Sequence, residues 1–295
     1  MRLSSLFTPI LCASLLAVLP NRMLGCDACG CGPASGLLTG QPLFGRSAVS
    51  LHTSFQNSTD ERVWGHAVTG SIPVFKNTLA LLQFNYQHSQ YVGLDEQGVE
   101  SSYSAGGLGD FGLGGFHRKH FKSGTYTVQG TIFLPTGVST LRTEAGQLHA
   151  TVFQPGNGAP GLRGGFSVLW GKPQAGISTE SQAEFWRRNT YGNQKPGQWA
   201  LGLSLYRAND GKSDKIARVA AGISYNGTSP AWESGTAYGK TTHRLSASIS
   251  GQLGFKDFLL FAHWRPTLFQ WGNQNSLNHT ALAVGLRIPI GSPRM

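Results

Sequence analysis

The stretch of sequence that decides the fold is 281-ALAVGLRIPI-290, close to the C-terminus. Every second residue in it is a large aliphatic, and the residues between are small or polar. The aliphatic set is Leu282, Val284, Leu286, Ile288 and Ile290, and the set between them is Ala281, Ala283, Gly285, Arg287 and Pro289. Residues 245–253 repeat the alternation, with Ser and Gln at the second set of positions. A period of two predicts extended strands whose two faces meet different surroundings.

Strands of about ten residues with one apolar face and one small or polar face are typical of a transmembrane β-barrel. In such a barrel the apolar face contacts lipid and the polar face lines the lumen. A water-soluble β-sandwich with its apolar faces turned inward would show the same alternation. We therefore predict an all-β fold, an antiparallel transmembrane β-barrel of about twelve strands in the bacterial outer membrane. A secreted soluble β protein is the alternative.

The composition fits many short strands joined by tight turns. Of 295 residues, 40 are Gly, 13% are charged and 40% are hydrophobic, which is too few for a bundle of membrane helices. The formal net charge is +10, but the basic residues are scattered and no DNA- or RNA-binding motif is present. Nucleic acid is therefore not an expected partner. Membrane lipid and the phosphates of lipopolysaccharide are the expected contacts of the exposed basic side chains.

The N-terminus predicts secretion. Arg2 precedes a run of apolar or small residues from Leu6 to Leu19, a pattern typical of a signal peptide. The run is shorter than the roughly 20 residues that a membrane-spanning helix needs, and no longer apolar run follows, so a membrane-spanning form must be a barrel. We expect a signal peptide at residues 1–25, a Cys- and Gly-rich segment at 26–46 and the barrel at 47–295.

A cluster of cysteines follows the signal peptide. Cys26, Cys29 and Cys31 lie within six residues, and the barrel region contains no cysteine. Three thiols so close together could hold a soft metal such as Cu(I) or Zn(II), with a fourth ligand from elsewhere. In an oxidising compartment two of them could instead form a disulfide. The quartet 23-MLGC-26 also resembles an imperfect lipobox, which would make Cys26 a lipidated first residue.

Loops and turns alternate along the barrel region. The segments that read as long loops are 93–105, 138–162, 189–196, 209–214 and 226–240, and 254–257 reads as a short turn. Long loops alternating with short turns are expected at opposite ends of a membrane barrel. Phe84, Tyr86 and Tyr91 are expected to form an aromatic girdle at the membrane interface, and Phe269 and Trp271 are assigned to a loop.

Short motifs in the middle of the chain carry a family resemblance. They are Gly107-x-Gly109-Asp110-x-x-Leu113, the strand ending Leu134-Pro135-Thr136-Gly137, and Phe153-Gln154-Pro155-Gly156-Asn157-Gly158. Over roughly residues 105–170 these motifs resemble the outer-membrane barrel family named for the meta-cleavage pathway of phenol degradation. The resemblance implies a transporter related in architecture to long-chain fatty-acid channels. The Cys-Asp-x-Cys-Gly-Cys start is similar to that of a set of uncharacterised outer-membrane barrels, whereas the ending Pro293-Arg294-Met295 departs from the aromatic C-terminus of many barrels.

Four charged residues are candidates for lining a transport path. Asp110 is too costly to expose to lipid, so it should face the lumen. Glu180 and Glu184 share the polar face of one alternating strand, and Arg287 lies on the polar face of the last. The two glutamates could also be read as a glycosidase pair. No Ser-His-Asp signature or nucleotide-binding loop is present, and we expect no enzyme.

We predict an outer-membrane channel or transporter for small solutes, with hydrophobic or aromatic molecules as the expected class. The first alternative is a metal-handling accessory protein of the outer membrane that uses the cysteine cluster. The second is the secreted soluble β protein.

Overall fold

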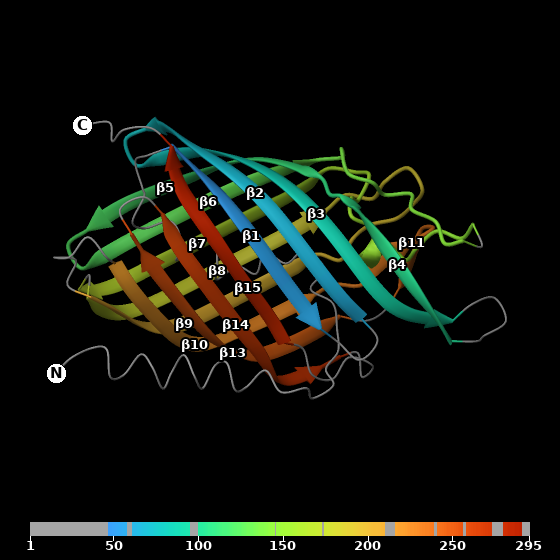
Figure 1. Cartoon of the computed structure of the whole chain (residues 1–295). Helices are drawn as coiled ribbons and strands as arrows, with labels where there is room; N and C mark the ends of the chain where they lie inside the picture. Colours follow the sequence, from blue (N-terminus) through green and yellow to red (C-terminus); the bar gives the residue numbers. More distant parts are fainter. Residues whose placement is uncertain are drawn as a thin grey trace.

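The structure, a computed structural model, describes residues 47–290 with gaps at 58–60, 95–99, 145, 173, 210–215, 239–240, 256–257 and 273–279. The described residues form tilted β-strands around a common axis (Figure 1). The strands are β1 (Ser47–Asn57), β2 (Glu61–Phe75), β3 (Thr78–Leu94), β4 (Glu100–Leu108), β5 (Phe111–Phe121), β6 (Gly124–Leu134), β7 (Gly161–Lys172), β8 (Ala175–Trp186), β9 (Gln198–Ala208), β10 (Ile216–Thr228), β11 (Ala231–Glu233), β12 (Thr236–Tyr238), β13 (Thr242–Gly254), β14 (Leu259–Trp271) and β15 (Thr280–Ile290). A 3-10 turn, η1 (Thr151–Phe153), follows β6. The described residues include no helix that is long and apolar enough to cross a membrane.

The sheet closes on itself into an antiparallel barrel. β15 pairs with β1 along its whole length, and β2 pairs with β3 to complete the wall. β3 pairs with β4 along one half and with β5 along the other, so β4 and β5 are two halves of one wall strand interrupted at Gly109 and Asp110. Counted in this way the wall has twelve strands, as predicted. β11 and β12 form a separate hairpin outside the wall.

The apolar faces of the strands point outward and the polar faces point inward. On β13, Ser246 is 2% exposed and Gln252 is 4% exposed, whereas Ile249 is 42% exposed. On β9, Leu203 and Leu205 are exposed in the same way. A soluble sandwich would bury these aliphatic side chains, so the alternative of a soluble protein is wrong. The exposed aliphatic surface is the face that contacts lipid, and the membrane-barrel prediction is confirmed.

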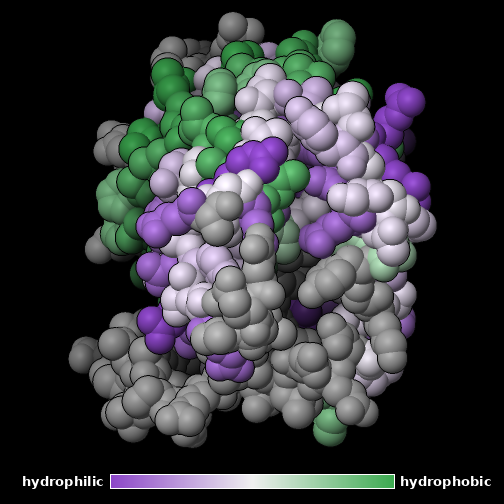
Figure 2. All heavy atoms as spheres, turned by 90° about the vertical axis from the view of Figure 1, so that its right-hand side faces the viewer, coloured by the Kyte–Doolittle hydropathy of each residue, from purple (hydrophilic) through white to green (hydrophobic). Residues whose placement is uncertain are grey.

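The two ends of the barrel differ. Short turns such as 76–77 and 122–123 join the strands at one end, on the left in Figure 1. The loops after β6, β8 and β10 lie at the other end, where β3 and β4 project beyond the rest of the wall. Figure 2 faces this loop end, over which hydrophilic residues dominate while hydrophobic ones gather along a flank. The connection 209–214, expected among the long loops, lies instead at the end of the short turns, because β9 ends and β10 begins there.

Two other boundaries differ from the prediction. β4 begins at Glu100, inside a segment expected to be a loop, because residues 100–108 pair with the far half of β3. β14 continues to its end at Trp271, where Phe269 pairs with Leu245 and Trp271 pairs with His243. Both aromatic residues therefore belong to a strand and not to a loop. Their large exposed side chains lie near the loop end of the wall, as an interfacial aromatic residue would.

Candidate functional site

The lumen is polar, and it carries more cations than carboxylates. Its wall is lined by serine, threonine, glutamine and asparagine side chains from the inner faces of the strands. The cations on the inner side among the described residues are Arg118, Arg163, Lys195, Arg218, Arg244, Arg265 and Arg287, and the carboxylates there are Glu61, Asp110, Glu180 and Glu184. The four residues predicted for a transport path thus all face inward. Their part in transport stays a prediction.

Asp110 stands at the interruption between β4 and β5 and is 3% exposed. Its carboxylate accepts hydrogen bonds from the backbone N–H of Gly137 at 2.9 Å and from that of Asn157 at 2.7 Å. The backbone beside it is also held, because the Gly109 N–H donates to the Asn85 carbonyl at 2.8 Å. Asp110 therefore joins the wall to two points of the loop after β6. This loop, residues 135–160, is called the inner loop below.

The glycines of the resemblance motifs let the backbones meet at this point. A Cβ atom added to Gly137 would lie 2.5 Å from the carbonyl carbon of Gly109, and one added to Gly156 would lie 2.5 Å from that of Gly137. Real Cβ atoms do not approach so closely, so only glycine fits at either position. The Val138 N–H donates to the Leu108 carbonyl at 2.9 Å, which adds the inner loop to the edge of β4. The motifs found in the sequence therefore form one structural unit.

Asn157 connects the inner loop to the loop after β8. Its side-chain amide donates to the Arg187 carbonyl at 2.8 Å, and its side-chain oxygen accepts from the Lys195 N–H at 2.8 Å. The Lys195 ammonium donates to the Pro155 carbonyl at 2.8 Å. Asn157 is 1% exposed, so these bonds are shielded from water. The two loops are thus fixed to one another across the loop end of the lumen.

The far part of the inner loop packs against the projecting half of β3. The rings of Tyr91 and Phe153 stack with centroids 3.7 Å apart at an interplanar angle of 11°, and the Tyr91 hydroxyl lies 2.6 Å from His149 Nδ1. The Thr151 N–H donates to the Glu233 carboxylate of β11 at 2.9 Å. Burial lowers the pKa of His149, and a backbone hydrogen bond at Arg142 offsets part of this. Tyr91, expected in the interfacial girdle, therefore belongs to the contact with the inner loop.

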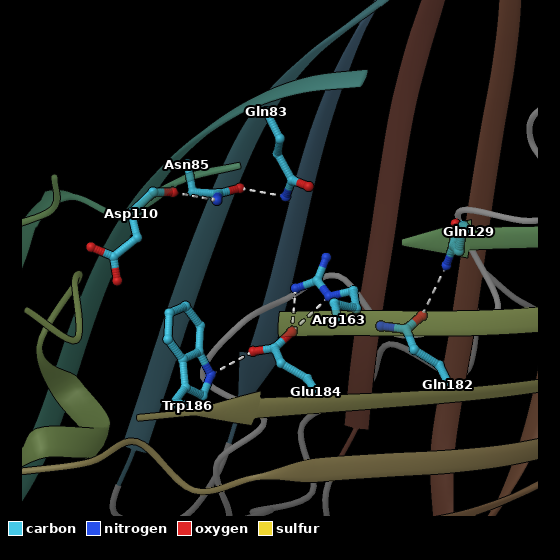
Figure 3. A network of polar contacts seen from close by, with 8 residues as sticks. All are labelled: Gln83, Asn85, Asp110, Gln129, Arg163, Gln182, Glu184 and Trp186. Carbon is cyan, nitrogen blue, oxygen red and sulfur yellow. Dashed lines mark hydrogen bonds and ion pairs between the residues drawn. The ribbon is translucent and has the colours of Figure 1, made fainter. Parts of the chain in front are cut away.

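A second polar network lies on the inner faces of β7 and β8 (Figure 3). Arg163 donates through Nε to Glu184 at 2.6 Å, and its Nη2 forms an ion pair with the same carboxylate oxygen at 2.5 Å. Trp186 donates its indole N–H to the other oxygen at 2.8 Å. The Arg163 guanidinium also lies over the Phe133 ring, 4.8 Å from its centroid. Glu184 is therefore a satisfied carboxylate that orients an arginine and a tryptophan.

Glu180 has different neighbours from Glu184. It faces the interior from the same strand, and the charge of Arg265 acts on it from β14. Because Glu184 is already bound by Arg163 and Trp186, the two glutamates have unequal surroundings. This arrangement favours a role in the charge of the lumen over a glycosidase pair, in which both carboxylates must flank one substrate.

A recess lies inside the barrel beside the inner loop, and the centre of a water-sized sphere can occupy about 50 Å³ of it. It is lined by His52, Ser54, Gly65, His66, Ala67, Asn85, Tyr86, Gln87, Gly109, Asp110, Phe133, Pro155, Arg163, Trp186 and Lys195. Rings, amides and charged groups thus meet at one place in the lumen, and Phe133 and Trp186 pack with ring centroids 5.1 Å apart. A small molecule entering at the loop end would meet this surface.

The predicted signal peptide (1–25) and the cysteine cluster lie outside the described residues. Metal binding by Cys26, Cys29 and Cys31 therefore stays a prediction, as does lipidation of Cys26. Within the described part of the chain, no group of three or more His, Cys, Asp and Glu side chains is placed to hold a metal ion.

Comparison with known proteins shows a likeness in structure only. No protein-family description matches this sequence, and no curated protein matches it. An outer membrane channel from Pseudomonas putida F1 is similar in structure, with a TM-score of 0.64 and 10% identity over 88% of this chain and 99% of that one. The β domain of the Bordetella autotransporter BrkA has a TM-score of 0.50 and 13% identity over 84% of this chain and 100% of that one.

These likenesses show the fold. The chain is an outer-membrane β-barrel of the Gram-negative type. The more specific family that the motifs resemble stays a prediction, and so does the solute. Sequence reasoning found Asp110 and the glycine motifs but missed Arg118, Arg218 and Lys195. For Arg118 a signal was present, because it continues the alternation of Phe116 on the inner face of β5.

Proposed function

We propose that the protein is a channel of the outer membrane for small solutes, aromatic molecules among them. The observation that carries the proposal is the closed wall of twelve strands around a polar interior, with lipid-facing side chains confined to its outer surface. A barrel that served only as an anchor would have no need of so many charged groups on its inner face. Buried charges are expensive to keep, so they indicate a functional surface.

The recess beside the inner loop supports the aromatic class. Phe133 and Trp186 line it but are only 1% and 7% exposed, and the cations of Arg163 and Lys195 lie over their rings. An aromatic solute would stack on these rings when the inner loop moves away from them, and its polar substituent would then meet a charged side chain. A purely aliphatic solute would bind the recess more weakly, because the other lining groups are mostly amides, hydroxyls and imidazoles.

The inner loop is the element that would control flux through the channel. It crosses the loop end of the lumen and depends on a small set of contacts, chiefly those of Asp110 and Asn157. A solute must pass beside it or displace it. The contacts that hold the inner loop therefore set how readily the channel conducts.

Two measurements on the refolded barrel test this function. In planar bilayers we expect discrete current steps in salt solution. In liposomes we expect the zwitterionic aromatic solute phenylalanine to drive swelling faster than a disaccharide does, and faster than in liposomes without the protein. Heat-modifiable migration on a gel would show that the reconstituted protein is folded. A folded barrel that gives neither current nor solute entry would overturn the proposal.

A further inference from the structure

Two pairs of lysines lie at the short-turn end of the barrel, on the left in Figure 1. The first pair is Lys76, in the turn between β2 and β3, and Lys119, near the end of β5. The Arg118 N–H donates to the Asn77 carbonyl at 2.8 Å, which continues the pairing of β3 with β5 into the turn. One step further along the same register, Lys76 occupies the position opposite Lys119.

The second pair adjoins the first. Lys122 lies in the turn between β5 and β6, and Lys172 is the last residue of β7. The Gly171 N–H donates to the Ser123 carbonyl at 2.9 Å, which continues the pairing of β6 with β7 into this turn. The next step of the register places Lys122 opposite Lys172. Because Lys119 and Lys122 are three residues apart in one hairpin, the two pairs form a single patch.

The lysines belong to the outer surface and not to the lumen. Arg118 is buried on the inner face of β5, so Lys119, the next residue, faces outward. Lys172 lies on the same face of β7 as Trp170, which is 42% exposed. The side chains of Lys76 and Lys122 are exposed in their turns. All four ammonium groups are therefore accessible from outside the wall.

Nothing acidic in the sequence around these lysines balances their charge. Residues 70–79, 114–130 and 166–179 contain no Asp or Glu. Among the described residues, no ion pair joins any of the four lysines to a carboxylate. Like charges directly opposite one another on neighbouring strands destabilise a sheet. Four cations kept together in this way are expected where an anion from outside the protein lies between them.

The patch borders a surface that contacts lipid. Lys119 pairs with Tyr126 of β6, and the rings of Tyr126 and Phe166 lie with centroids 6.3 Å apart on the outer face. Trp170 lies two residues before Lys172 on the same face. Aromatic rings at this height form the interfacial girdle of a barrel, and lysine stems lie along such rings while their ammonium groups reach the lipid headgroups.

The opposite side of the barrel is different at the same end. There the outward-facing residues nearest the short turns, within the described ranges, are aliphatic: Leu253 on β13, Leu260 on β14 and Ile288 on β15 are each more than 40% exposed. The lysines are thus concentrated on one side of the wall. Such an uneven distribution favours a local binding site over a uniform ring of cations that would only fix the height of the barrel in the membrane.

We propose that Lys76, Lys119, Lys122 and Lys172, the lysine patch, bind the phosphate groups of anionic phospholipids. Short turns lie on the periplasmic side of such barrels, where the leaflet is built of phospholipids. Clusters of four or more Lys and Arg residues beside a membrane-spanning segment attract anionic lipids. Zwitterionic lipids gain less, because their own cation competes for the phosphate. This inference goes beyond the proposed channel function and does not depend on it.

Trp170 reports which lipid lies beside the lysine patch. The folded barrel is reconstituted in phosphatidylcholine vesicles that contain a graded fraction of brominated phosphatidylglycerol or brominated phosphatidylcholine, both of which quench tryptophan. The signal of Trp170 is the difference between the wild type and Trp170→Phe. We expect half of this signal to be quenched at a fraction of brominated phosphatidylglycerol at least ~5-fold lower than that of brominated phosphatidylcholine.

Substitutions of the four lysines assign this preference to the patch. With all four changed to Gln, the two lipids should quench Trp170 at equal fractions, and with all four changed to Arg the preference for phosphatidylglycerol should be retained. Arg62→Gln removes an exposed cation from β2 at the loop end and should change nothing. Heat-modifiable migration shows that each variant is folded. If the fourfold Gln variant does not fold, the two double variants decide, and each should lower the preference at least ~2-fold.

Three results would overturn the site. The first is equal quenching by the two lipids in the wild type, or a preference that survives in the fourfold Gln variant. The second is a preference of the same size at Trp271, at the loop end, since the net charge of +10 would then explain it. The third is displacement of phosphatidylglycerol by an equal concentration of inorganic phosphate at constant ionic strength, which would assign the patch to the free ion. None of these results depends on conductance, so the channel function is tested separately.

Discussion

Asp110 is the residue on which the position of the inner loop depends most directly. Each charge-assisted bond to a carboxylate contributes about 1.5–3 kcal/mol, against about 0.5–1.5 kcal/mol for a bond to a neutral amide oxygen. An asparagine side chain also has only one acceptor oxygen for the two backbone N–H groups. In Asp110→Asn we therefore expect the inner loop to open more often, with noisier and larger single-channel currents. Amide hydrogen exchange should be faster in residues 135–160, while the strands stay protected.

The control for this substitution is Glu144→Gln. Glu144 lies in the same loop, but its side chain is exposed, so its loss should change neither current nor exchange. Faster exchange that spreads through β5 and β6 in Asp110→Asn would contradict the prediction. It would mean that the carboxylate holds the wall itself together and not the loop against it.

Some inward-facing residues could be predicted from the sequence, because the alternation along a strand determines on which face of the wall each side chain lies. Glu184 and Arg287 follow from counting in twos along their own strands, and Asp110 follows from the cost of putting a charge in lipid. Tyr91 was assigned to the interface with Phe84 and Tyr86, although it falls on the opposite parity. Its partner, Phe153, lies in a loop, and nothing local in the sequence brings the two rings together.

The interruption between β4 and β5 could not be predicted, because the sequence pattern of a strand does not show which part of the chain pairs with it. Residues 107–116 read as one glycine-rich strand, yet the Leu108 carbonyl accepts from Val138 of the inner loop and not from a wall strand. The partner is distant in the chain and has no strand pattern of its own. Glycine at this density inside a strand is typical either of a close approach by another part of the chain or of sharp curvature. What approaches could be learned only from the fold.

The inner loop should respond to pH through His149. Because burial lowers the pKa of His149 in the docked loop, the released loop binds the proton more tightly. Docking is therefore most stable above the ordinary histidine pKa of about 6.5 and weakens as the pH falls below it. Between about pH 7 and pH 5 we expect faster amide exchange in residues 135–160 and more frequent current fluctuations.

Two substitutions separate this effect from general acid sensitivity. His149→Gln keeps a polar group beside Tyr91 and removes the titration, so the pH dependence of exchange in the inner loop should be lost. His120→Gln changes an exposed histidine of β5 at the end of the barrel opposite the inner loop. It should leave the pH dependence of exchange in the inner loop unchanged. An unchanged pH response in His149→Gln would show that another group controls the docking of the loop.

For the molecule as a whole, the sequence predicted the number of strands and the two faces of the wall, but not which inward residues meet. Alternation is a property of one strand. The hydrogen bond from Arg287 on β15 to Ser71 on β2, for example, depends on how far each strand is shifted against its neighbours and on closure of the barrel. Residues on strands that are not neighbours in the wall then come together across the interior, which counting along the chain cannot show.

Two neighbouring residues of one strand can test the prediction that the outer face of the wall contacts lipid and the inner face is polar. Val128 and Gln129 are neighbours near the middle of β6; the side chain of Val128 is 45% exposed on the outer face, and that of Gln129 lies inside near Gln182. Val128→Arg puts a charge in lipid and should lower the free energy of unfolding by about 2–4 kcal/mol, measured by denaturant titration in lipid vesicles. Gln129→Arg puts the same side chain in the polar interior and should cost less than about 1 kcal/mol. An equal or larger loss for Gln129→Arg would mean that the inner face, and not the outer one, is the apolar environment of this barrel.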